Sequence, residues 1–166
     1  MGTKRVGWAR IRSLINENQN ALYMQKQVAT TITGDTTLTA ADSGKMVAIN
    51  YDTAATITVT LPTPASGLAF DFVFVADMTA NTAKIRFDGL ETGAMTGVVI
   101  AMEDDGTGQG AKADGGGDRY FDVDGNPDVR AASKLRCECA DGSNWTITGI
   151  VIAGSTAKDS IGFASS

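Results

Sequence analysis

Residues 56–76, TITVTLPTPASGLAFDFVFVA, decide the fold class of this chain. Apolar and polar residues alternate in both halves of the stretch, which predicts two strands that each turn one face toward a core. The inward-facing sets are Ile57, Val59 and Leu61, followed by Phe70, Phe72 and Phe74. Between the two halves, Pro62, Pro64 and Gly67 are residues typical of turns. The stretch therefore predicts a β domain with a core built from alternate residues of short strands.

The same pattern recurs over most of the chain. Further strands are predicted at 29–33, 36–39, 46–50, 83–88, 97–102, 119–123, 134–140 and 144–152. Short strands separated by turn residues at intervals of about 8–12 residues favour a mainly β fold, an antiparallel β-sandwich or jelly roll over residues 29–153. Residues 103–118 read as an exposed Gly/Asp-rich loop. Residues 154–166 read as a flexible tail, anchored by Ile161 and Phe163.

The first 28 residues differ from the rest and predict a short amphipathic helical arm ahead of the β domain. Between residues 8 and 25, an apolar stripe recurs at helical spacing, and Leu14 widens it. The stripe consists of Trp8, Ile11, Ile15 and Leu22. The polar Asn18 stands at the position where this spacing predicts a further apolar residue. A lone helix of this length is marginal in water, so we expect a partner to cover its stripe.

Charge separates the arm from the β domain. The net charge is −5. Residues 1–26 carry five bases and one acid, a net charge of +4, whereas residues 27–166 carry nine bases and eighteen acids, a net charge of −9. A domain of that sign repels nucleic acid and anionic membranes.

The arm itself has two readings. Its cations can contact phosphates, or they can pair with acidic groups on a protein, but the apolar stripe is useful only against a protein. We therefore expect no nucleic-acid partner. The residues predicted to dock onto another subunit or a larger particle are Arg5, Trp8, Arg10, Ile11, Arg12, Leu14, Ile15, Asn18 and Leu22.

The sequence offers little catalytic chemistry. It contains no His, which excludes histidine-based triads and most zinc sites. No dinucleotide or Walker A motif is present. Cys137 and Cys139 would face the same side of a strand, where they are expected to act as small, reduced, apolar side chains. No apolar run is long enough for a membrane span, and no secretory signal is predicted. We expect a protein that is not an enzyme.

One segment resembles a metal site. In FDVDGNPD, residues 121–128, oxygen ligands stand at alternate positions, as in calcium-binding loops. Pro127 replaces the Gly that an EF-hand needs, and Ser133 replaces its bidentate Glu. Two readings stay open, an exposed turn between strands and a calcium site; otherwise no cofactor is expected. The candidate calcium ligands are Asp122, Asp124, Asn126 and Asp128.

Three stretches of the sequence follow recurring patterns. Residues 36–75, TTLTAADSGKMVAINYDTAATITVTLPTPASGLAFDFVFV, are similar to a pattern in which a strand and an xDSGK turn precede ITVTLPxPxxGxxFxF. SKLRCECADGSNWTITG, residues 133–149, resembles a companion hairpin, and MGTKRVGWARIRSLIN, residues 1–16, is similar to a short basic N-terminal arm. Together they resemble virion structural proteins of tailed phages, including phages of marine bacteria and cyanobacteria.

The resemblance implies a non-enzymatic structural protein that is often a homotrimer. One expectation is a capsid decoration, or cement, protein that contacts itself and the major capsid protein or other virion proteins. The alternative is a tail, fibre or knob module that recognises a host-surface glycan. Either protein would be made in the host cytoplasm and end in the virion. The cysteine pair, although it lies within residues 133–149, is not part of the pattern, and neither are residues 103–118.

Overall fold

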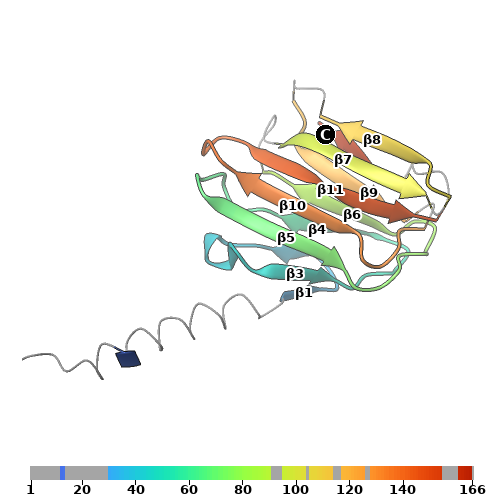
Figure 1. Cartoon of the computed structure of the whole chain (residues 1–166), viewed down its shortest axis with the longest axis horizontal. Coiled ribbons are helices and arrows are strands. Elements are labelled where there is room, and N and C mark those ends of the chain that lie inside the picture. The colour runs from blue at the N-terminus through green and yellow to red at the C-terminus, as the bar shows by residue number, and fades with distance from the viewer. Residues whose placement is uncertain are drawn as a thin grey trace, which may run out of the picture.

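The computed structural model describes residues 12–13, 30–90, 95–103, 105–113, 117–125, 128–154 and 161–165. Over these residues the chain folds into two β-sheets that pack face to face (Figure 1). A single turn of 3₁₀ helix, η1 (Ala40–Asp42), lies between β2 (Thr36–Thr37) and β3 (Met46–Ile49). The prediction of a mainly β, sandwich-like domain is therefore confirmed.

Each sheet gathers strands from distant parts of the chain. From one edge to the other, the larger sheet contains β1 (Thr30–Ile32), β3 (Met46–Ile49), β5 (Leu68–Phe74), β10 (Lys134–Cys139), β11 (Trp145–Ala153), β7 (Met95–Glu103) and β8 (Gly108–Lys112). The smaller sheet contains β12 (Ile161–Ala164), β9 (Tyr120–Asp124), β6 (Lys84–Asp88), β4 (Thr56–Thr60) and β2 (Thr36–Thr37). We call them the seven-stranded and the five-stranded sheet.

Both sheets contain parallel and antiparallel pairs, so the antiparallel arrangement predicted for a sandwich or jelly roll is wrong. From β1 to β6 the chain passes alternately from one sheet to the other. Each strand in this part therefore lies parallel to the next one in its own sheet, as β1, β3 and β5 do. The tight turn at Asp141–Gly142 instead joins β10 and β11 as an antiparallel hairpin. The connection decides the strand direction, because only neighbours in the same sheet can be joined by a short hairpin.

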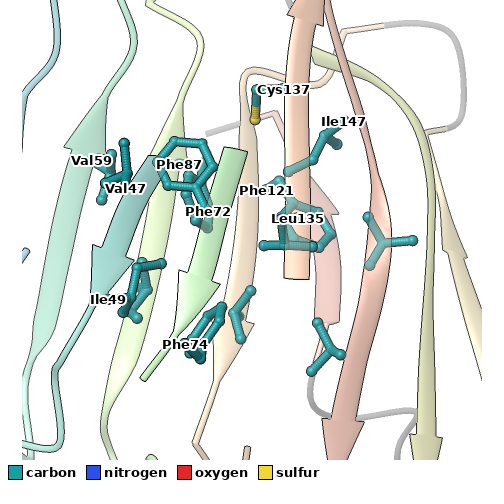
Figure 2. Close-up of a cluster of buried hydrophobic side chains, with 14 of the residues drawn as sticks. Val47, Ile49, Val59, Phe72, Phe74, Phe87, Phe121, Leu135, Cys137 and Ile147 are labelled. Carbon is teal, nitrogen blue, oxygen red and sulfur yellow. The ribbon is translucent and has the colours of Figure 1, made fainter. Parts of the chain in front are cut away.

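Alternate residues of both sheets form one core (Figure 2). The inward-facing sets of β4 and β5 are buried, as their sequence predicts. Phe72 packs edge-on against Phe87 of the opposite sheet, with ring centroids 4.9 Å apart. Trp145 is fully buried against Phe70, and its indole N–H donates to the carbonyl of Pro62 at 3.2 Å. Cross-sheet aromatic packing thus fixes how the two layers sit on each other.

Two segments predicted as irregular are strands. Residues 108–112 form β8, at the edge of the seven-stranded sheet and antiparallel to β7, so the loop prediction is wrong there. Residues 161–164 form β12, antiparallel to β9, so the tail is not flexible over these residues. The two anchors predicted in the tail are confirmed: Ile161 is buried, and Phe163 lies 5.0 Å from Phe121 between ring centroids.

Candidate interaction surface

The outer face of the seven-stranded sheet carries exposed apolar side chains on two neighbouring strands. β7 and β11 run parallel with Ile100 beside Ile150 and Met102 beside Ile152. The alternate residues of both strands point into the core. The exposed fractions are 47% for Val98, 45% for Ile100, 40% for Met102 and 49% for Ile150. We call Val98, Ile100, Met102, Ile150 and Ile152 the apolar patch.

The neighbouring edge strand leaves this patch open. In β8, Gly110 stands opposite Ile100 and Gly108 stands opposite Met102. A Cβ at Gly110 would meet nothing closer than 3.9 Å, so a side chain would fit there, yet the sequence supplies none. Because β8 contributes only backbone at these two positions, it does not shield the β7 side chains from solvent.

A depression continues the patch toward the other edge of the sheet. This groove encloses about 670 Å³. Its apolar lining includes Met46 of β3, Val73 of β5 and Ala132 before β10, together with the two isoleucines of β11 that belong to the patch. The groove and the patch therefore adjoin at Ile150 and Ile152 of β11, whereas the outer face of β10, between β5 and β11, carries Lys134, Arg136 and Glu138.

Charged groups of β5 and β10 lie within the groove. The Arg136 guanidinium donates to Glu138 at 3.0 Å and to Asp71 at 2.8 Å. The hydrogen bond to Glu138, followed by that to Asp71, raises the pKa of Arg136 above its usual value. Lys134 and Arg136 both line the groove. Charged side chains of both signs thus lie between the apolar side chains of β3 and those of β11.

The outer face of the five-stranded sheet has the opposite character. Arg86 of β6 forms a bidentate pair with Asp122 of β9, with both N···O distances at 2.8 Å. Two guanidiniums contact the Tyr120 ring, with Arg86 4.5 Å and Arg119 4.9 Å from the ring centroid. Charged groups that satisfy one another on the sheet surface need no further partner. This face is therefore suited to contact with solvent, in contrast to the apolar patch on the seven-stranded sheet.

The three candidate calcium ligands that the structure describes each lie close to a basic side chain. Asp122 and Asp124 lie on the outer face of β9, and Lys84 of β6 approaches both carboxylates, at 3.8 and 3.4 Å. Asp128 lies 3.7 Å from Arg130. Asn126 lies outside the described residues, so the calcium site stays a prediction. Across the described ranges, no three acidic, Cys or His side chains converge in a way that could hold a metal ion.

The predicted docking residues fall almost entirely outside the described part of the chain. Of that set the structure describes only Arg12, which, like Ser13, has helical backbone and is exposed. The other members, from Arg5 to Leu22, remain predictions, as does the helix over residues 8–25.

The two cysteines behave as the sequence predicts. Cys137 and Cys139 are both buried and unbridged, side by side on the inner face of β10. Burial raises the pKa of the Cys137 thiol well above its usual range, which makes a reactive thiolate unfavourable. Within the described ranges, no helix is long and apolar enough to cross a membrane.

The apolar patch was not among the sites predicted from sequence, although a signal for it exists. Residues 98–102, VVIAM, are apolar at every position. A strand that is apolar on both faces is typically covered on both faces, whereas a strand with one solvated face alternates. The uninterrupted run therefore predicts that the outer face of β7, like its inner face, is covered, in this case by a partner.

Comparison of the chain with protein-family models, curated proteins and solved structures finds no match.

Proposed function

We propose that this chain is a non-enzymatic structural protein of a tailed-phage virion, most simply a capsid decoration protein. Its task is to associate with copies of itself, as a homotrimer, and with the major capsid protein, and so to stabilise the shell. The N-terminal arm makes the attachment, and the β domain provides a rigid body. The protein is made in the host cytoplasm and resides in the finished virion.

One structural observation carries the proposal: the exposed apolar patch on β7 and β11 of one sheet, beside a groove, opposite a sheet whose charges pair with one another. Exposed apolar area of this kind is typical of protein–protein contact sites. The sequence resemblance to virion proteins supplies the kind of assembly. The net charge of −9 over residues 27–166 fits a protein partner better than nucleic acid or an anionic membrane.

The alternative, a tail or fibre module that binds a host glycan, has less support. Sugar sites typically combine aromatic platforms with polar groups, and the lining of the groove is mainly aliphatic where it is apolar. Calcium-assisted recognition through residues 122–128 is also disfavoured, because Lys84 and Arg86 occupy the carboxylates of β9.

Copy number in purified particles distinguishes the two locations. A decoration protein covers the shell and is therefore present in hundreds of copies, whereas a tail or fibre module is present in only a few. Quantitative mass spectrometry against the major capsid protein measures this ratio. A count of only a few copies per particle would overturn the capsid assignment.

Removal of the arm tests the mode of attachment. Deletion of residues 1–27 is expected to leave a folded β domain that no longer assembles or binds shells, as measured by sedimentation and by co-pelleting with undecorated capsids. Ile15→Asp in the full chain should act similarly, because it places a charge in the stripe. Ser13→Asp, on the polar side of the predicted helix, is the matched control. Full binding by the truncated chain would refute this role of the arm.

A further inference from the structure

We propose that the groove and the apolar patch of the seven-stranded sheet bind the N-terminal arm, residues 8–22, of a second copy of this chain. The inference rests on the self-association part of the proposed function. It names the surface that receives the arm, which the proposed function leaves unassigned.

The surface is built to be covered. Ile100, Met102 and Ile150 expose 40–49% of their area, although their strands lie in the interior of the sheet. In the neighbouring β8, Gly110 lies beside Ile100 and Gly108 beside Met102, so no β8 side chain covers these two residues. Burial of these side chains on association is favourable, at about 25 cal/mol for each Å² of apolar surface removed from water.

The arm has the matching shape and chemistry. Its stripe combines a large aromatic residue, Trp8, with aliphatic residues such as Ile11 and Ile15. A helix over residues 8–22 would be about 22 Å long. The strands from β5 to β7, by way of β10 and β11, span about 14 Å between their axes. One such helix is thus long enough to lie across the groove and the patch together.

Charge favours the same pairing. The arm has a net charge of +4, and the rest of the chain has a net charge of −9. At the groove, the side chains of Asp71 and Glu138 are 51% and 46% exposed, so both carboxylates keep access to a further cation beside their bonds to Arg136. Basic residues of the arm on either side of its stripe, such as Arg10 and Arg12, can reach these carboxylates while the stripe lies on the apolar side chains.

The arm comes from a second copy. Arg12 and Ser13 are both exposed, so neither is buried against a sheet of its own chain. The described β domain begins at Thr30, at the β1 edge, whereas the apolar patch lies near the opposite edge of the same sheet. An arm donated to a neighbour can cover that neighbour's sheet, and repetition of this contact around an axis closes a ring of identical subunits.

Cross-linking between two full-length variants tests this arrangement. An Ile15→Cys chain is mixed with a differently tagged Ile150→Cys chain and treated with a short bis-maleimide. Cys137 and Cys139 are buried and do not compete. Ile150 is half exposed, so its replacement leaves the core intact. The matched control replaces Ile150→Cys with Thr58→Cys, on the outer face of the five-stranded sheet.

The expected result is a mixed covalent dimer at a yield at least about tenfold above the Thr58→Cys control, since a bound arm raises the local thiol concentration. A yield equal to the control overturns the proposal. Dominant cross-linking of Ile150→Cys chains to one another would instead assign the surface to a second copy's sheet. A chain that carries both Ile15→Cys and Ile150→Cys tests binding of the chain's own arm. If this double variant cross-links only within itself, the surface binds the arm of the same chain. Either of these two results refutes the binding of a second copy's arm.

Sedimentation of the unaltered chain separates failure of this inference from failure of the proposed function. An oligomer without the Ile15–Ile150 cross-link refutes only the arm–groove contact. A chain that stays monomeric at high concentration refutes both self-association and the contact that rests on it.

Discussion

At the residue scale, the seven-stranded sheet depends on glycines that no other residue can replace. Gly97 of β7 has a φ of +124°, in the region that disfavours side chains. A Cβ built there would overlap the backbone carbonyl of Ile147 on β11. Gly149 of β11 is similarly close to the backbone of β10, at Lys134. These two positions let three strands approach one another beneath the groove.

Gly97→Ala is therefore expected to destabilise the fold by more than about 2 kcal/mol, because either the backbone angle or the β7–β11 pairing must change. Chemical denaturation measures the loss. Gly110→Ala on β8 is the matched control, since its Cβ would meet nothing closer than 3.9 Å. Equal stability of the two variants would show that β7 can shift to relieve the overlap.

At the element scale, alternation in the sequence predicts the position of a strand and its inward face, but not its neighbour. The pattern located β4 and β5 and their buried sides, because burial of every second residue leaves a period of two. It missed β8, in which Ala111 is the one apolar residue, and β12, which is short and follows a small-residue segment. Pairing direction depends on contacts far along the chain, so the parallel strands had no local signal.

The short strand β12 is expected to matter for stability despite its position near the C-terminus. Phe163→Ala removes a ring that packs on Phe121 and is partly buried, so a loss of about 1–3 kcal/mol is expected. Denaturant titration measures it. The nearby Ser165→Ala, at an exposed position, serves as the control. No difference between the two variants would mean that β12 contributes little to the folded state.

At the scale of the whole molecule, carboxylates that accept hydrogen bonds tie loops to strands and make the fold sensitive to acid. Hydrogen bonds from Lys45 and then Thr39 lower the pKa of Asp42 from 3.8 to about 2. The backbone N–H groups of Ala80 and Thr79 lower the pKa of Asp52. Burial alone would raise the pKa of Asp88, but its bonds to Arg119 and Leu90 lower it overall.

Because these pKa values are lower in the folded than in the unfolded chain, the folded state binds fewer protons at acidic pH. Their stabilisation is complete well above pH 3.8 and is lost as the pH falls through the folded values, near 2 for Asp42. The melting temperature should therefore hold between pH 7 and 5 and fall between pH 4 and 2. Scanning calorimetry across this range checks the trend, and a constant melting temperature down to pH 2 would contradict it.

The alternation of β1 to β6 between sheets also has a consequence for the order of folding. Paired strands in this part are close in sequence: Thr30 pairs with Val47, and Val47 pairs with Phe72. The second partners of β5 and β7 come much later in the chain, because Phe72 also pairs with Leu135 and Met95 pairs with Trp145. During synthesis at about 5–20 residues per second, β1 to β6 can pair while the apolar β7, with only β8 beside it, lacks β11 for seconds. Pulse-labelled hydrogen exchange should find amides of β3 and β4 protected before those of β7, and simultaneous protection would exclude this sequence of events.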